Sequence, residues 1–164
     1  GPQNNADAPA SGAAYLFSLH PTLAVTGSKG TLKNRPKAQK DAIDVHGTLG
    51  FLPQPPDGVL DPIAEGASIQ CGPDELPAHF ALPAGAGWKA TQNGFKFKSA
   101  KGAEPSIRFT LNAVTGEFQL KARKLDFPAP LSNPIDCTVR IGNDWGAWSA
   151  PWRDQKKHTL FQFP

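Results

Sequence analysis

The feature that most constrains the fold is a pair of cysteines in two similar alternating segments. Cys71 ends the run 67–71 and Cys137 lies within the run 135–141, and each cysteine shares its alternate positions with apolar residues. Because successive side chains of a strand point to opposite faces, both thiols are expected to face the interior. Two inward cysteines on separate strands suit a disulfide that joins the two sheets of a β-sandwich. We therefore predict a Cys71–Cys137 disulfide and an oxidising compartment: secreted, periplasmic or cell surface.

The predicted disulfide has a structural role. It would close a loop of about 66 residues, for which chain entropy predicts a stabilisation of ~4 kcal/mol. A catalytic thiol needs a neighbouring base and a polar setting, whereas Cys137 lies between Ile135 and Val139 on an apolar face. The alternative to the disulfide is two reduced, buried cysteines in a cytosolic domain.

Composition and patterning predict the fold class. The 16 glycines and 17 prolines are spread between short alternating runs, which is typical of turns in an all-β domain. We predict an antiparallel β-sandwich of immunoglobulin-like or jelly-roll type with about nine or ten strands. Residues 1–14 are expected to be a tag remnant, Gly1-Pro2, and a flexible linker, and residues 15–164 a single domain.

Period-two alternation places the individual strands. An Asn93-Gly94 pair predicts a type I′ hairpin turn between two of them. The segments with a strand pattern, from which about nine or ten strands are expected, are 15–19, 22–26, 43–51, 67–71, 78–82, 88–91, 95–98, 106–111, 117–123, 135–141 and 160–163.

Two further segments carry a pattern. Residues 27–42 hold five Lys and Arg residues against a single acid, Asp41, which predicts a solvated basic loop that could bind an acidic polymer. The sequence also contains an internal echo: Gly47 precedes Gly72 by 25 residues, and Gly116 precedes Gly142 by 26, with a Pro-Ile pair inside each interval. The echo indicates a duplicated strand-loop-strand unit, or else chance similarity in a chain rich in proline and glycine.

The most distinctive local segment is 143–154, for which Gly146 and Pro151 predict a loop or an irregular edge. Its aromatic rings could stack on sugar rings, form a protein-binding hot spot, or cap one end of the core. The candidate binding residues are Trp145, Trp148 and Trp152, with Asp144 and Arg153 as hydrogen-bonding partners.

Motifs for catalysis or metal binding are not found in the sequence. The four histidines have no short metal-ligand spacing, and no nucleophile elbow, zincin motif or phosphate-binding glycine loop is present. The net charge of +3 does not imply nucleic-acid binding, and no apolar run approaches the roughly 20 residues that span a membrane. We therefore predict neither an enzyme nor a cofactor or metal.

The function expected from the sequence is that of a non-catalytic structural or adhesive module within a larger secreted or cell-surface protein. Its partners would be a glycan or another extracellular protein, together with other domains of the parent chain. The alternative is a carbohydrate-binding module that uses the Trp-rich segment.

Overall fold

The computed structural model describes residues 21–35, 37, 40–51, 60–72, 79–127, 135–155 and 160–163. The expectations for residues 1–14 and for the strand 15–19 lie outside these described residues. Within them, no helix is long and apolar enough to cross a bilayer.

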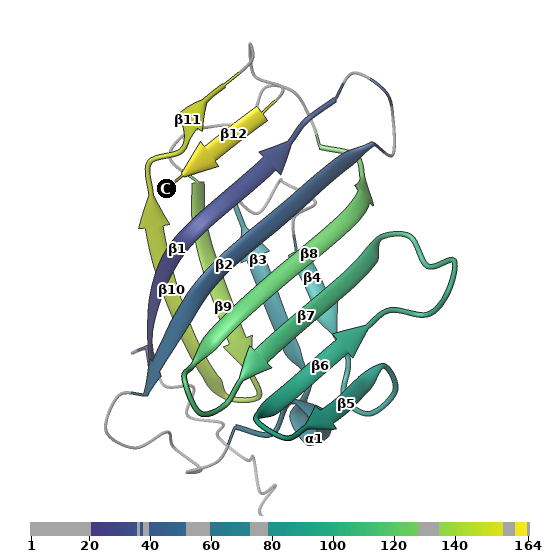
Figure 1. Cartoon of the computed structure of the whole chain (residues 1–164), viewed down its shortest axis with the longest axis vertical. Helices are drawn as coiled ribbons and strands as arrows, with labels where there is room; N and C mark the ends of the chain where they lie inside the picture. Colours follow the sequence, from purple (N-terminus) through teal and green to yellow (C-terminus); the bar gives the residue numbers. More distant parts are fainter. Residues whose placement is uncertain are drawn as a thin grey trace, which may run out of the picture.

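The described residues form two antiparallel sheets, and the predicted all-β sandwich is confirmed (Figure 1). One four-residue helix, α1 (Pro62–Glu65), is capped at its start by the Asp61 carboxylate. The large sheet contains, in spatial order, β11 (Arg153–Asp154), β12 (Leu160–Phe163), β1 (Leu23–Lys33), β2 (Asp41–Phe51), β8 (Glu117–Leu125), β7 (Ser106–Asn112), β6 (Gly94–Lys98) and β5 (Trp88–Thr91). The small sheet contains β10 (Asp144–Ala150), β9 (Ile135–Ile141), β3 (Ala67–Cys71) and β4 (His79–Leu82).

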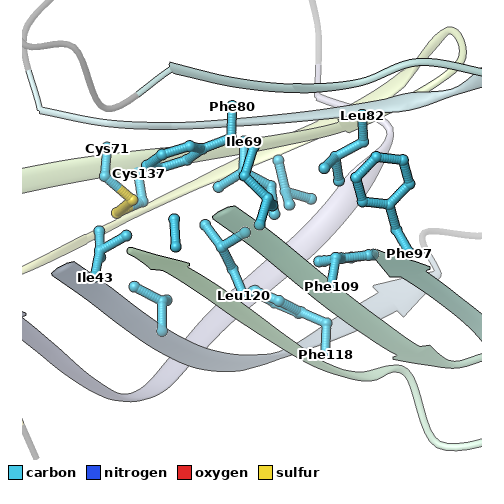
Figure 2. Packing of buried hydrophobic residues seen from close by; sticks show 14 of the residues in the cluster. Ile43, Ile69, Cys71, Phe80, Leu82, Phe97, Phe109, Phe118, Leu120 and Cys137 are labelled. Carbon is cyan, nitrogen blue, oxygen red and sulfur yellow. A yellow bond between two sulfur atoms is a disulfide. The ribbon is translucent and has the colours of Figure 1, made fainter. Parts of the chain in front are cut away.

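The core lies between the two sheets and is built from the inward half of each alternating strand (Figure 2). The period-two pattern is clearest in β9, where every inward residue is buried and the outward residues are partly or fully exposed. Because each strand contributes its apolar face to the same interior, the polar faces of both sheets remain outside. The largest fully buried residues of the core include Phe80, Phe109, Ile69 and Leu120.

The predicted disulfide is present, but its place in the fold corrects the sequence prediction. Cys71 and Cys137 lie directly opposite each other on β3 and β9, neighbouring strands of the small sheet, with their Cα atoms 4.1 Å apart. The bond therefore joins two strands of one sheet instead of linking the two sheets. Figure 2 shows the sulfur atoms in the interior. A bond between the two sheets would place them there too, so an inward orientation alone does not distinguish the two arrangements.

The basic segment 27–42 also differs from its prediction as a loop. The structure continues β1 to Lys33, with a register shift between Gly27 and Lys29, and begins β2 at Asp41. The Asp41 carboxylate is buried and accepts hydrogen bonds from the backbone N–H groups of Arg35 and Phe127 at 2.5 and 2.7 Å. Lys29 and Lys33 consequently lie on a sheet instead of in a solvated loop.

The β5–β6 hairpin is confirmed, but its turn falls one residue earlier than predicted. Thr91 pairs with Gly94, so the two connecting residues are Gln92 and Asn93. Gly94 has a φ of 155°, and a Cβ atom added there would lie 2.0 Å from the carbonyl oxygen of Leu111. The glycine is therefore required by the close approach of β7 and not by a type I′ turn.

The internal echo corresponds to adjacent strands. β2 pairs with β8, and β3 pairs with β9, both antiparallel. Thr48 lies opposite Glu117 and Ile69 lies opposite Val139, offsets of 69 and 70 residues. The echo has the same offsets, from residue 47 to 116 and from 72 to 142. The two units thus each contribute one strand to each sheet, in the arrangement that an approximate twofold relation requires.

Replacing both cysteines by alanine is expected to lower the free energy of unfolding by about 2–5 kcal/mol, because the unfolded chain regains the freedom of a 66-residue loop. Urea unfolding followed by tryptophan fluorescence measures the change. Wild-type protein treated with a reductant should lose a similar amount, and an unchanged midpoint in both samples would contradict a stabilising disulfide.

Gly94→Ala is expected to lower the free energy of unfolding by about 1–3 kcal/mol, because the added methyl group overlaps the end of β7. Gly50→Ala is the matched control, since its Cβ atom would meet only Ala24, at 3.4 Å or more. That variant should gain about 0.4–1 kcal/mol from a less flexible unfolded chain. Equal effects of the two variants in thermal unfolding would refute the close approach at Gly94.

Candidate anion-binding face

The outer side of the large sheet gathers much of the positive charge of the chain. In Figure 1 this sheet lies in front of the small one, and no labelled element covers it. The carboxylates of Asp44 and Glu117 also lie on this side. The outward positive side chains, which we call the basic face, include Lys29, Lys33, Lys89, Lys96, Lys98, Arg108, Lys121, Arg123 and Arg153.

Several of these charges lie directly opposite one another on neighbouring strands. Lys98 on β6 faces Arg108 on β7, which in turn faces Lys121 on β8. One row further along, Lys89 on β5 faces Lys96 on β6. Like charges that face each other across a strand pair are destabilising, by roughly 0.2–1 kcal/mol for each pair. The large sheet therefore holds a repulsive arrangement that an anionic ligand would relieve.

A hydrogen-bonded cluster lies beside these rows, where β2 meets β8. Asp44 Oδ1 lies 3.0 Å from His46 Nε2 and accepts a hydrogen bond of 2.9 Å from Gln119 Nε2. Lys121 Nζ is 3.5 Å from Asp44 Oδ2. Gln119 Nε2 is also 2.7 Å from His46 Nε2. The cluster fixes the position of Lys121 and offsets the charge of the carboxylate.

His46 can change the charge of the basic face. Partial burial lowers its pKa below the ordinary value of 6.5, the charges of Lys29 and Lys121 lower it further, and the carboxylate of Asp44 opposes them. A neutral ring with its lone pair on Nε2 accepts from Gln119, whereas a protonated ring donates from Nε2 to Asp44. Protonation thus adds one positive charge beside Lys29.

A shallow groove of about 560 Å³ crosses the large sheet from β1 to β5. Its outward lining follows one row of cross-strand neighbours, Lys96, Thr110, Gln119, His46 and Lys29. The groove presents ammonium, hydroxyl and amide groups, and its lining also includes the Glu117 carboxylate and the apolar residues Phe95, Leu111 and Phe118. Its length and its hydrogen-bonding groups suit an extended chain, and its cations lie at the two ends, Lys29 and Lys96.

The Trp-rich segment forms strands, where the sequence predicts a loop or irregular edge. β10 is the edge strand of the small sheet and packs against the start of β1. Trp145 N donates to Thr22 Oγ1 at 3.0 Å, and Thr22 N donates to the Trp145 carbonyl at 2.9 Å. A Cβ atom at Gly146 would lie 2.3 Å from the Leu23 carbonyl oxygen. The glycine therefore permits the contact between the two sheets instead of breaking the strand.

The five binding residues predicted in this segment are not brought together on one surface. Trp148 and Trp152 are core residues with 8% and 2% of their surface exposed, and Asp144 is fully buried. Trp145 is half-buried on the outer side of the small sheet, and Arg153 is exposed on β11 of the large sheet. Stacking on a sugar needs an exposed ring face, so the core interpretation holds for Trp148 and Trp152.

Sequence reasoning missed the basic face as a unit. The signal was present in the outward positions of 94–98, 106–112 and 117–123, where lysine and arginine alternate with apolar residues. The pattern does not give the strand order. The charges form rows only because β6, β7 and β8 are neighbours in the large sheet. The basic loop predicted at 27–42 contributes only Lys29 and Lys33 to the basic face.

Comparisons with known proteins do not assign the chain to a family. No family model matches the sequence, and neither the curated proteins nor the solved structures contain a match. Among the residues that the structure describes, no group of three or more His, Cys, Asp or Glu side chains is placed to hold a metal ion.

Two single variants should move the pKa of His46 in opposite directions. Asp44→Asn removes the carboxylate that favours the imidazolium and should lower the pKa further, whereas Lys29→Gln removes a repelling charge and should raise it. NMR titration of the imidazole resonances measures both. Because folding lowers this pKa, the contribution of His46 to stability is complete above pH 6.5 and declines as the pH falls towards the folded-state pKa. Shifts of the same sign in the two variants would contradict the cluster.

Proposed function

We propose that this protein is a non-catalytic adhesive module of a larger secreted or cell-surface protein, and that its basic face binds an anionic polysaccharide. The observation that carries this proposal is the run of like charges across neighbouring strands, Lys98, Arg108 and Lys121. These pairs oppose folding. A sheet surface that favours folding alone would alternate the signs of its charges, so the arrangement is understandable as a binding surface.

The geometry of the face explains how such a polymer would bind. Neighbouring strands are roughly 4.8 Å apart, so a row of cross-strand positions presents charges at short, regular intervals. The groove from Lys29 to Lys96 adds the hydroxyl of Thr110 and the amide of Gln119 between its cations. Ammonium groups would bind the acidic substituents, while the hydroxyl and amide groups would bind sugar hydroxyls.

Two observations favour a polysaccharide over a nucleic acid. The Cys71–Cys137 disulfide is compatible with an oxidising compartment outside the cytosol. The outward positions of the large sheet, within the described residues, carry no Phe, Tyr or Trp. Proteins that bind single-stranded nucleic acid usually add aromatic platforms on which the bases stack. Phe95 and Phe118 contribute to the groove lining from inward positions, so binding to the outward side chains would depend on charge and hydrogen bonds.

The alternative is a carbohydrate-binding module based on tryptophan, and Trp145 is the remaining candidate for stacking on a sugar. Trp145 lies opposite Arg140 on the outer side of the small sheet and is half-buried. One partly covered ring offers a much smaller stacking area than a platform of three. We therefore place the ligand on the basic face and treat Trp145 as a residue to test separately.

Arg108→Gln is expected to separate stability from binding. Removing the central charge of the row should raise the free energy of unfolding by about 0.2–1 kcal/mol. It should also weaken binding to dextran sulfate about tenfold and reduce the slope of log Kd against log salt concentration by about one. Urea unfolding and calorimetric titration at several salt concentrations measure these effects.

Arg140→Gln is the matched control, because it makes the same substitution on the outer side of the other sheet. It should leave binding to dextran sulfate unchanged, and neutral dextran should not bind to either protein. Equal losses in the two variants would show that net charge, and not the basic face, determines binding. Tighter binding to single-stranded DNA than to polysaccharides of equal charge density would overturn the choice of ligand class.

A further inference from the structure

A small depression of about 180 Å³ lies at one corner of the basic face, where β1, β2 and β8 are neighbours. Its lining includes Lys33, Lys121, Arg123 and the hydroxyl-bearing Thr31. We propose that this depression is a subsite for a tetrahedral oxyanion, a sulfate or phosphate ester carried by the polymer. The inference rests on the proposed function and specifies the substituent that the polymer must carry.

The depression exists because a short side chain lies between two long cationic ones. Lys33, Ala42 and Arg123 are cross-strand neighbours in one row. Lys33 and Arg123 are two strands apart, which is roughly 10 Å at the backbone. The Ala42 methyl group leaves the space between them open, so both side chains can approach a single anion from opposite sides.

The next row supplies the remaining wall. Thr31, Asp44 and Lys121 are cross-strand neighbours, one row along from Ala42. The Asp44 carboxylate lines the depression as well, but its charge is offset by Lys121 at 3.5 Å, and it accepts a hydrogen bond of 2.9 Å from Gln119. It therefore holds Lys121 in place at the rim, while the ammonium protons that do not face Asp44 remain able to bind a ligand.

The donor set distinguishes a tetrahedral group from a carboxylate. A carboxylate has two oxygens in one plane, and a single guanidinium such as that of Arg123 can bind both. A sulfate or phosphate ester has three terminal oxygens that point in different directions. The depression offers donors from three directions, which suits these oxygens. Lys33 and Arg123 lie on two sides, and Lys121 and the Thr31 hydroxyl lie on a third.

The test compares polymers that differ in their charged group alone. Dextran sulfate, phosphorylated dextran and carboxymethyl dextran of equal charge density are titrated into the wild-type protein and three variants. The wild type should bind at least one of the tetrahedral esters about tenfold more tightly than the carboxymethyl polymer. The ester that binds more tightly identifies which of the two sources the subsite accepts.

Ala42→Val is the decisive variant, because it fills the depression, keeps every charge and suits a strand. It should abolish the preference for the ester while leaving the affinity for carboxymethyl dextran unchanged. Arg123→Gln should also reduce the preference. Lys96→Gln, on the basic face but outside the depression, should weaken binding to all three polymers equally. Unfolding curves confirm that each variant is folded.

The failures of the two proposals are distinguishable. If the wild type binds the polymers but without preference, or if the preference survives in Ala42→Val, the subsite is overturned and the basic face stands. If the wild type binds none of the three polymers, the proposed function itself is overturned, and the subsite with it.

Discussion

The pairing of β2 with β8 is the interaction on which the rest of the structure depends. It joins β1 and β12 on one side of the large sheet to β7, β6 and β5 on the other. Its inward pairs, such as Val45 with Leu120, are fully buried in the core. Its outward pairs, such as Asp44 with Lys121, lie on the basic face. One ladder of hydrogen bonds therefore sets both the packing of the interior and the spacing of the external charges.

This dual role explains how a repulsive surface can be tolerated. A strand fixes the direction of each side chain through its alternation, so a residue that faces outward cannot turn inward to avoid a like charge. The inward partners of the same strands, Phe109 and Leu120 among them, are fully buried. Burial of one such side chain is worth about 1.5–3 kcal/mol, which exceeds the cost of a like-charge pair outside it. Sites that break a local rule in this way are where function is expected.

Much of the fold could be predicted from the sequence, because period-two alternation and turn residues are local signals. The inward direction of Cys71 and Cys137, and the strands 67–71 and 106–111, follow from that alternation and agree with the structure. The order of the strands within each sheet does not follow from these local signals. Whether two inward cysteines share one sheet or face each other across two sheets depends on long-range pairing, which no local pattern encodes.

The candidate site shows the same division between local signals, which the sequence contains, and long-range strand pairing, which it does not reveal. The outward lysines and arginines were visible in each segment, but their rows exist only when β6, β7 and β8 are neighbours. The Trp-rich segment differs from its prediction for another reason. Gly146 and Pro151 indicate a loop or an irregular edge, whereas residues 144–150 form the edge strand of the small sheet. The missing side chain of Gly146 allows the Leu23 backbone to approach β10, so the glycine supports a contact that is absent from the local sequence.

The position of the disulfide has a mechanical consequence. β12 pairs antiparallel with β1, so the last residue of β12, Phe163, lies opposite Gly30 and its strand runs back towards Leu23 (Figure 1). Tension on the chain at these two strands would act at the same end of their ladder and separate the hydrogen bonds one after another. Extension would then stop at Cys71 and Cys137. The covalent bond bypasses the 66-residue interval between them, so those residues add no contour length and β4 to β8 remain within a closed loop.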